Sequence, residues 1–225
     1  MKLSDRTLSI LKTFKEINPS ILIRPGHKPT YVSLTGKSVI GTLAPSKKVM
    51  AFAEIEEEFT DNVCIYDLGR FLTALSLFKD PDITFHKHHA TVTAEGRSIN
   101  YTFCEPETID QPPPAFPKPD FEVEFDLSAK SLSEILKASA VLNAPNIIME
   151  GDGTTLTIKV TDIKNPVSHS YSVEVGQSAE SFRTVFKTEV FKLLPGDYTV
   201  GTSLRVPIAT FLGDGTEFFL AAEKA

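Results

Sequence analysis

Few residues of this 225-residue chain have the types and the spacing that catalysis requires. The segment 35–38, TGKS, resembles the end of a phosphate-binding loop, but that motif needs a glycine five positions earlier, where Tyr31 stands. His86 and His88 would share one face of a strand and could bind a metal ion, but no third ligand is near in the sequence. An exposed hairpin that includes His89 is therefore the favoured interpretation, and no metal site is predicted.

The two cysteines, Cys64 and Cys104, lie in apolar strand contexts. Neither is near a histidine in the pattern of a nucleophile, and two such thiols are typical of buried, reduced residues in a cytosolic compartment rather than of a disulfide framework. The sequence therefore predicts a binding scaffold without a cofactor, and not an enzyme. Because it has no run of roughly 18 apolar residues and no charged-then-apolar leader, neither a membrane span nor a secreted precursor is expected.

The elements that would position binding residues recur along the chain. Apolar residues stand at helical spacing in four segments, each followed by a proline: 3–17, 68–78, 132–139 and 186–194. Leu72 and Leu132 are 60 residues apart, and so are Leu75 and Ile135. Asp67 is the expected N-cap of the second helix. Self-similarity at a steady period indicates repeated supersecondary units.

Strand-like segments bounded by glycine and proline turns separate the predicted helices. The expected strands are residues 21–24, 30–34, 39–43, 49–59, 63–66, 82–86, 90–94, 98–104, 146–150, 154–160, 168–175, 197–204, 206–212 and 217–222. Residues 105–120 hold six prolines, which indicates an extended linker. The prediction is an α+β protein of two similar domains, 1–108 and 121–225, joined by a proline-rich linker at 109–120. Each domain would be a doubled helix-plus-antiparallel-sheet unit.

The charge is divided between the helices and the rest of the chain. The whole chain has a net charge of −6, yet the four helical segments with their ends hold 11 basic and 6 acidic residues. The helical segments therefore carry +5 and the remainder carries −11. A cationic face on an anionic body is typical of a protein that binds a polyanion. The alternative is that the lysines only solvate exposed helix faces.

Several segments resemble the DNA polymerase sliding clamps of T-even-type bacteriophages. They are 1–4 (MKLS) with Leu11, Phe14, Ile17 and Asn18, 65–68 (IYDL) with Phe71, Leu72 and 75–77, and, more loosely, 194–198 (LPGDY) and 219–223 (FLAAE). The resemblance covers the whole chain. It departs most between His27 and Thr60, where this chain is longer than expected, so no loop contact is carried over there.

The resemblance implies the clamp fold and a closed homotrimeric ring of six pseudo-equivalent domains, with helices lining the hole and sheets outside. Such a ring encircles double-stranded DNA without sequence specificity, has no catalytic activity of its own and tethers the replicative DNA polymerase. An ATP-dependent clamp loader would place it on primer–template DNA in the cytoplasm of the infected bacterial host. Whether transcription factors also bind it stays open.

A second function class fits part of the pattern. A β-rich oligomeric structural or attachment protein of a virion would explain the many strands and the tendency to form oligomers. It would not explain why positive charge is confined to the predicted helices.

Helical wheels and the resemblance together predict three sets of site residues. The cations opposite or beside the apolar stripes are predicted to face DNA phosphates, and they are Lys12, Lys15, Arg70, Lys130, Lys137, Lys187 and Lys192. The resemblance implies a pocket for a C-terminal polymerase peptide at Phe116, Pro207, Phe219 and Ala221. It also implies a subunit interface between strand edges, through Ile99, Tyr101 and Phe103 on one strand and Tyr171, Val173 and Val175 on the other.

Overall fold

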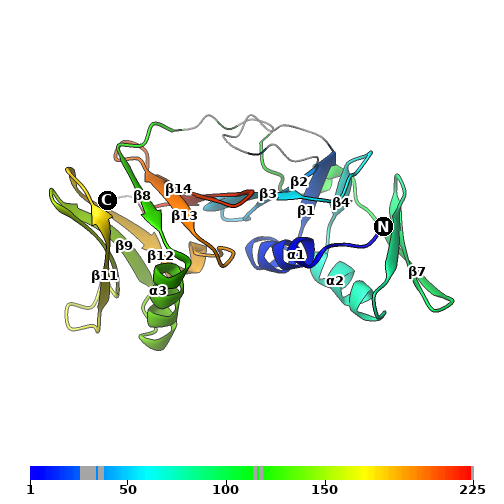
Figure 1. The fold of residues 1–225 in the computed structure, drawn as a ribbon, viewed down its shortest axis with the longest axis horizontal. Coiled ribbons are helices and arrows are strands. Elements are labelled where there is room, and N and C mark those ends of the chain that lie inside the picture. The colour runs from blue at the N-terminus through cyan, green and yellow to red at the C-terminus, as the bar shows by residue number, and fades with distance from the viewer. Residues whose placement is uncertain (26–33, 35–37, 114–115, 117–118, 224–225) are drawn as a thin grey trace. The chain divides into compact units, whose positions relative to one another are not determined.

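The computed structural model describes residues 1–25, 34, 38–113, 116 and 119–223. The chain forms two compact units, Met1–Pro117 and Lys118–Ala225, here called unit 1 and unit 2 (Figure 1). The boundary between them falls within the predicted linker segment 109–120. Both units combine antiparallel sheets with few helices, which confirms the predicted α+β class.

Three of the four predicted helices form. They are α1 (Asp5–Ile17), α2 (Leu68–Ser76) and α3 (Ala129–Val141). Each begins after a capping residue, Ser4, Asp67 or Ser128, whose side chain accepts a hydrogen bond from the N–H three residues further on, at 3.2, 2.9 and 3.1 Å. These caps satisfy donors that the first turn of a helix leaves unpaired. Asp67 is thus the N-cap that the sequence predicts.

The first turn of α1 has a further partner from a distant part of unit 1. The two carboxylate oxygens of Glu57 accept hydrogen bonds from the Ser4 N–H at 2.6 Å and from the Thr7 hydroxyl at 2.7 Å. A negative charge is favourable at this end of a helix because the helix dipole is positive there. Glu57 therefore fixes the start of α1 against the chain that follows β3 (Val49–Ile55).

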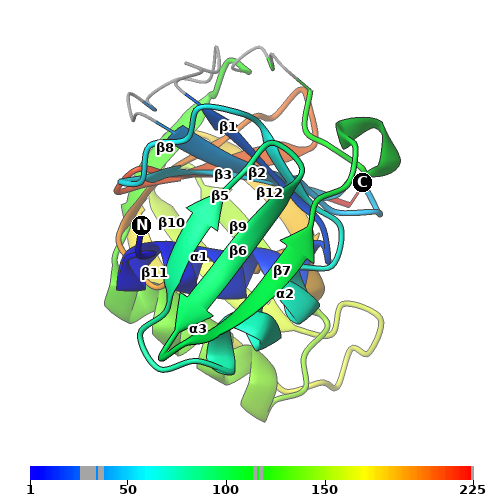
Figure 2. The same cartoon turned by 90° about the vertical axis from the view of Figure 1, so that its right-hand side faces the viewer.

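Unit 1 contains two antiparallel sheets, with the strand orders β4-β1-β2-β3 and β5-β6-β7. Their strands are β1 (Ile21–Pro25), β2 (Ser38–Leu43), β3, β4 (Val63–Ile65), β5 (Asp82–Phe85), β6 (His89–Ala94) and β7 (Arg97–Thr102). Met1 extends the second sheet, because it exchanges two backbone hydrogen bonds with Ile83 of β5, at 2.7 and 2.8 Å. α1 packs on β2 and β3, and α2 packs on β7 (Figure 2).

Unit 2 repeats this arrangement, with the strand orders β12-β9-β10-β11 and β8-β13-β14-β15. Its strands are β8 (Val123–Leu127), β9 (Asn146–Asp152), β10 (Thr155–Thr161), β11 (Tyr171–Gln177), β12 (Ser181–Lys187), β13 (Tyr198–Thr202), β14 (Ile208–Gly213) and β15 (Thr216–Ala221). α3 packs on β10 and β11. The buried aromatic residues Phe186, Phe211 and Phe218 form the centre of this unit's core.

One rule of construction describes all four sheets. A leading strand, a helical segment and three further strands make one repeat, and the three strands stay neighbours in one sheet. The leading strand pairs in the sheet of the other repeat of its unit: β4 with β1, β12 with β9 and β8 with β13. Met1 beside β5 occupies the fourth such position. The repetition that the sequence predicts is therefore present in the sheets.

The prediction of a fourth helix at 186–194 is wrong. Residues up to Lys187 belong to β12, and only a 3₁₀ turn, η2 (Thr188–Val190), follows before β13. Phe186 pairs with β9, so the strand takes the first residue of the predicted helical stripe. Pro195 ends the remaining segment after a few residues, and so short a helix has too few internal hydrogen bonds to offset its nucleation.

The apolar residues of this segment fill the core instead. Phe191 is 6% exposed, and its ring contacts those of Phe186 and Phe211 with centroids 5.7 Å away in each case. The Tyr198 hydroxyl donates a hydrogen bond to the Leu194 carbonyl at 2.7 Å, and burial raises the pKa of Tyr198 to about 12. The segment 188–195 therefore covers the sheet β8-β13-β14-β15 in the position that a helix holds in the other repeats.

The remaining departures concern strands. β8 and β12 are not among the strands that the sequence predicts. The strand expected at 168–175 begins later, at Tyr171, and the one expected at 49–59 ends at Ile55. The strand expected at 30–34 lies outside the described residues, apart from Leu34.

Candidate functional surfaces

Five of the seven cations predicted to face DNA lie on α-helices. Lys12 and Lys15 are exposed on α1, Arg70 is exposed on α2, and Lys130 and Lys137 are exposed on α3. Each helix buries its apolar stripe, so these cations lie on the solvent side. Exposed cations on helix faces can contact phosphates without reading the bases.

The other two predicted cations are not on a helix, and their predicted helical position is wrong because the fourth helix does not form. Lys187 ends β12, and Lys192 follows the η2 turn; both are exposed. The segment that holds Lys192 nevertheless lies beside α3. Lys137 of α3 lines a groove of about 330 Å³ together with Leu193 and Leu194. Lys137 and Lys192 thus come from adjacent segments of unit 2.

The seven cations differ in their ion pairs. Four have a neighbouring carboxylate: Lys15 with Glu16 at 3.6 Å, Arg70 with Asp67 at 3.0 Å, Lys130 with Glu134 at 4.0 Å and Lys187 with Glu189 at 3.9 Å. Lys12, Lys137 and Lys192 have no ion pair with any residue that the structure describes. An exposed ion pair contributes only about 0–1 kcal/mol to stability. The paired cations can therefore leave their carboxylates and turn toward a phosphate.

A groove of about 520 Å³ lies in unit 2, where β12 meets the connection between β13 and β14. It is lined by residues 181–184, 203–207 and 222–223. Leu204 and Val206 supply exposed apolar surface, with 40% and 52% of each residue accessible. An open groove with a few apolar anchors is suited to a short peptide in an extended or turned conformation.

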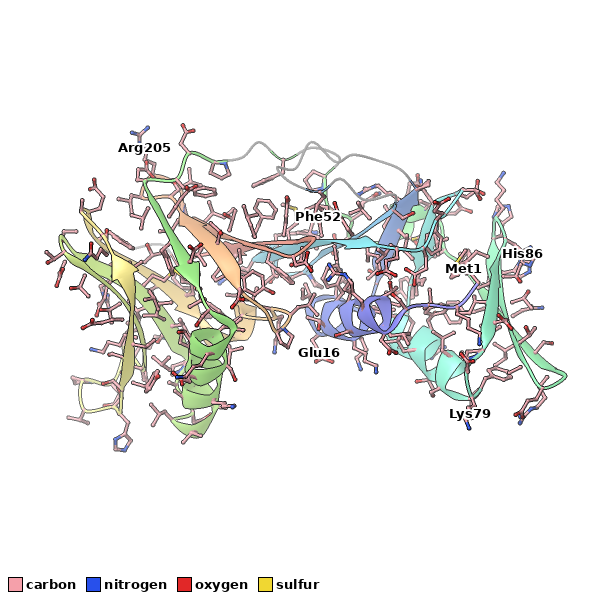
Figure 3. All side chains as sticks on the ribbon, viewed as in Figure 1. Met1, Glu16, Phe52, Lys79, His86 and Arg205 are labelled. Atoms are coloured by element: carbon pink, nitrogen blue, oxygen red, sulfur yellow. The ribbon has the colours of Figure 1, made fainter. Side chains whose placement is uncertain are left out.

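A carboxylate holds the connection that forms one wall of the groove. Glu122 Oε1 lies 3.0 Å from Arg205 Nε, and Glu122 Oε2 accepts a hydrogen bond from the Leu204 N–H at 2.9 Å. The hydrogen bond from Leu204 is the main interaction that lowers the pKa of Glu122. Figure 3 shows Arg205 projecting from this connection. Glu122 therefore fixes the connection to the start of β8.

The four predicted pocket residues have different positions. Pro207 is exposed and lines the groove, and Ala221 is the half-buried end of β15 beside it. Phe219 is 3% exposed and Phe218 is fully buried, so both belong to the buried core. The residues of β15 are buried up to Ala221, which is half-buried. Phe116 belongs to unit 1 and is half-buried.

Sequence reasoning missed most of the groove. Its residues from β12, 181–184, are not part of any strand or helix that the sequence predicts. The signal that could have found the connection is weak: apolar Leu204 and Val206 flank Arg205 before a proline, in a stretch without glycine.

β7 and β11 are among the edge strands of the described residues, and they are the two strands predicted to form the subunit interface. β7 pairs only with β6, and β11 pairs only with β10. Half-buried residues alternate with exposed ones along both strands. All six residues of the predicted interface are half-buried: Ile99, Tyr101, Phe103, Tyr171, Val173 and Val175. A free edge carries unpaired N–H and C=O groups that can pair with another chain.

Each edge strand is fixed to a helix of its own unit through a tyrosine. The Tyr101 hydroxyl donates a hydrogen bond to the Asp67 carbonyl at 2.7 Å. The ring of Tyr101 contacts the ring of Phe71, with their centroids 5.2 Å apart. The Tyr171 hydroxyl donates to Glu134 Oε2 at 3.3 Å. Burial is the main cause that raises the pKa of both tyrosines. The edges are therefore held in defined positions from which their backbones can be paired.

Three histidines, His86, His88 and His89, lie on the β5–β6 hairpin. His86 and His89 flank its turn, with ring centroids 4.4 Å apart. Within the described ranges, no three side chains of histidine, cysteine, aspartate or glutamate gather in a way that could hold a metal ion. No helix in the described part of the chain is long and apolar enough to cross a membrane.

Known proteins with similar sequences are described as sliding clamps. Residues 124–224 match the family model "gp45 sliding clamp, C terminal". The chain is 30% identical to the sliding clamp of Vibrio phage KVP40, over 99% of both chains. It is 29% identical to the sliding clamp of Escherichia phage RB69, over 89% of this chain and 86% of that protein. A solved structure of A. fulgidus PCNA with the C-terminal region of FEN-1 has the same fold, with a TM-score of 0.69 over 96% of this chain and 94% of that one at 12% identity.

Proposed function

This chain belongs to the sliding clamp family, and on that premise we propose that it encircles duplex DNA as a homotrimeric ring and tethers the replicative DNA polymerase for processive synthesis. The observation that carries the proposal is the similarity to the KVP40 clamp along the entire length of both chains. Two clamp domains, 1–108 and 121–225 with a linker at 109–120, would give six domains around the ring. The alternative of a virion structural protein has no support, since the relatives are sliding clamps.

The DNA contacts come from the exposed cations Lys12, Lys15, Arg70, Lys130, Lys137, Lys187 and Lys192. Their support is that all seven are exposed and that five lie on the solvent side of helices. Long, flexible side chains with weak or no ion pairs suit contacts that must be exchanged as a ring slides. Each contact would be to phosphate and independent of sequence.

The ring closes by pairing β7 of one copy with β11 of the next. Both strands lack prolines, so each keeps the N–H groups that a ladder needs. The two edges differ, so the contact is head-to-tail, and such contacts close into a ring when the rotation per copy is right. Because a clamp must open to admit DNA, the interface should be modest, and the trimer should dissociate on dilution.

The polymerase binds through a C-terminal peptide in the groove of unit 2. Pro207 at the rim and the exposed apolar groups of Leu204 and Val206 support this position. The peptide would contribute a few buried apolar anchors, which is how most of the affinity of such contacts is obtained. Phe219 would contribute from the core, and Ala221 and Phe116 would flank the peptide.

The remaining parts of the proposal concern other partners and the site of action. The protein performs no catalysis, so an ATP-dependent loader opens and closes the ring on primer–template DNA. It acts in the cytoplasm of the infected bacterial host, as expected of a protein related to phage clamps. Use of the same surface by transcription factors is compatible with the groove but has no observation of its own.

Primer extension tests the proposal directly. With polymerase, loader and ATP on a primed circular template, adding the protein should lengthen the products made in one binding event. A linear template with free ends is the matched control, because a ring can slide off it, and there the gain should be much smaller. Equal product lengths with and without the protein on circular DNA would reject the clamp function.

A further inference from the structure

The two cysteines of unit 1 are brought together by the fold. Their Sγ atoms lie 2.8 Å apart, although 40 residues separate them in the sequence. Cys64 is in β4, and Cys104 follows the end of β7. The Cys104 N–H donates a hydrogen bond to the Cys64 carbonyl at 3.0 Å, so the two backbones are also adjacent. Both thiols are free.

We propose that Cys64 and Cys104 form a dithiol site that reacts with a low-molecular-weight disulfide and closes into an internal disulfide between β4 and the end of β7. The support is geometric. Hydrogen-bonded partners in neighbouring strands have Cα atoms about 5.5 Å apart, within the range that a disulfide spans. The sulfur atoms need only a small further approach.

The reaction is a thiol–disulfide exchange in two steps. The Cys104 thiol loses its proton to solvent and attacks one sulfur of the small disulfide, whose other half leaves as a thiolate and takes up a proton. Cys64 then loses its proton and attacks Cys104 Sγ, which expels the second half as a thiol. The protein dithiol is oxidised by two electrons, and one small disulfide is reduced to two small thiols.

Exposure decides the order of these steps. Cys104 is half-buried and can be reached from solvent, whereas Cys64 is 2% exposed. Burial, followed by the contact with Cys104, raises the pKa of Cys64, so Cys64 is a poor nucleophile toward a molecule in solution. The second step is intramolecular, and the proximity of the two sulfur atoms compensates for that weakness.

The cross-link would join the two sheets of unit 1. β4 belongs to the sheet β4-β1-β2-β3, and Cys104 directly follows the sheet β5-β6-β7. The closed loop would contain α2 and all three strands of the second sheet. A disulfide that closes a loop of this length removes many conformations from the unfolded chain and stabilises the folded one.

The test uses the full-length protein in glutathione buffers of increasing oxidising power, followed by alkylation and mass spectrometry. We expect the folded wild type to lose the mass of two hydrogen atoms and both alkylation sites, with a peptide linking Cys64 to Cys104. Its denaturation temperature should rise by about 5–10 °C and return on reduction. Cys64→Ala is the matched control and should instead accumulate a mixed disulfide on Cys104.

Several outcomes would overturn the proposal. Wild type could stop at the mixed disulfide, as the control does, or form a cross-link between two molecules through Cys104. Thiols that stay reduced in the folded protein under conditions that oxidise the unfolded protein would also reject it. None of these results depends on clamp activity, so the outcome is separate from that of primer extension.

Discussion

The last sheet of unit 1 and the last sheet of unit 2 end in the same pair of backbone hydrogen bonds. In unit 1, after β7, the Phe103 N–H donates to the His88 carbonyl at 2.9 Å, and the Cys104 N–H donates to the Cys64 carbonyl at 3.0 Å. The first acceptor lies in the connection between β5 and β6, and the second lies in β4, the leading strand of the repeat.

Unit 2 has the same arrangement after β15. The Ala222 N–H donates to the Pro207 carbonyl at 2.8 Å, and the Glu223 N–H donates to the Val185 carbonyl at 2.7 Å. Here the acceptors lie in the connection between β13 and β14 and in the leading strand β12. The ends of the two sheets are therefore equivalent in backbone.

The two sheet ends differ in the length of one connection, which joins β5 to β6 in unit 1 and β13 to β14 in unit 2. In unit 1, two residues separate His86 from His89, and the His86 N–H donates to the His89 carbonyl at 2.8 Å. In unit 2, four residues separate Ser203 from Ile208, and the Ser203 N–H donates to the Ile208 carbonyl at 3.1 Å. The longer connection forms a wall of the groove and exposes its apolar side chains. The comparison indicates that the groove arises from a lengthened connection on a sheet end with the same backbone hydrogen bonds.

The largest expected effect concerns the free edges, where unit 1 of one copy should meet unit 2 of the next. Neighbouring residues of an antiparallel strand direct their N–H groups alternately toward the partner strand and away from it. Proline at Val173 and proline at Glu174 should therefore act differently. One of these two variants should lose an N–H that bonds to β10, which disturbs the sheet. The other should lose only an N–H at the open edge of β11.

We expect the edge-only variant to be a folded monomer that no longer supports processive synthesis. Sedimentation velocity and circular dichroism measure the two properties. Proline at Ile99 or at its neighbour Asn100 makes the same test on β7. If every folded variant of both strands stays trimeric, the subunits meet elsewhere.

The second prediction compares the segments that cover the two final sheets. Phe71 of α2 is 1% exposed and Phe191 of the segment 188–195 is 6% exposed. If that segment replaces a helix, Phe191→Ala should lower the free energy of unfolding by about 3–5 kcal/mol, as large a loss as Phe71→Ala causes. Tyr198→Phe, which removes the hydroxyl that donates to Leu194 and keeps the ring, should cost about 1 kcal/mol.

Denaturant unfolding of the three variants makes this measurement. A loss below about 1 kcal/mol for Phe191→Ala, with the usual loss for Phe71→Ala, would mean that the segment 188–195 is a loosely attached loop. The units would then differ in their cores as well as in their connections.

The third prediction uses the equivalence of Pro207 and His88. Pro207→Glu places a charge in the groove and should weaken binding of the polymerase C-terminal peptide by roughly tenfold or more, because burying that charge against apolar anchors is unfavourable. His88→Glu puts the same charge at the matching position of unit 1 and should leave peptide affinity unchanged. Titration calorimetry compares both with wild type.

A loop variant sharpens the same point. Replacing residues 204–207 with a two-residue Asn-Gly turn should restore the connection length of unit 1 and keep the sheet, since that dipeptide favours tight hairpins. It should abolish peptide binding in a folded protein. Normal peptide affinity in the folded loop variant would show that the groove is not the polymerase site.

The smallest effect is expected from the cations. Lys12, Lys137 and Lys192 lack ion pairs within the described part of the chain, whereas Lys15, Arg70 and Lys130 each have one. Replacing the first three with alanine should reduce the salt dependence of DNA association more than replacing the second three, because paired cations release fewer counterions.

Each single change should lower loading or processivity only modestly, since sliding contacts are interchangeable. Salt titrations of loading on circular DNA measure the slope. A variant that combines Lys12→Ala, Arg70→Ala, Lys130→Ala and Lys192→Ala yet tethers polymerase as well as wild type would show that these residues do not face DNA.

The sequence by itself determined the features that depend on local patterns. Helical spacing and prolines located α1, α2 and α3, Asp67 marked the start of α2, and the 60-residue spacing revealed the repeat and the fold class. The exposed positions of the helix cations also followed, because a helix with one apolar stripe must turn its other face to water. Such signals are contained within a dozen or so neighbouring residues.

Only the tertiary structure decided the features that depend on distant pairing. Phe186 and Val190 stand at helical spacing, but β9 offers hydrogen bonds to β12 that a short helix could not match. Phe218 and Phe219 are adjacent in a strand and so point to opposite faces of the sheet, yet both side chains are buried. The Glu57 cap on α1, the Met1 contact with Ile83 and the Cys64–Cys104 pair join residues 40 to 82 positions apart. No local pattern encodes these contacts, because each exists only after the sheets have formed.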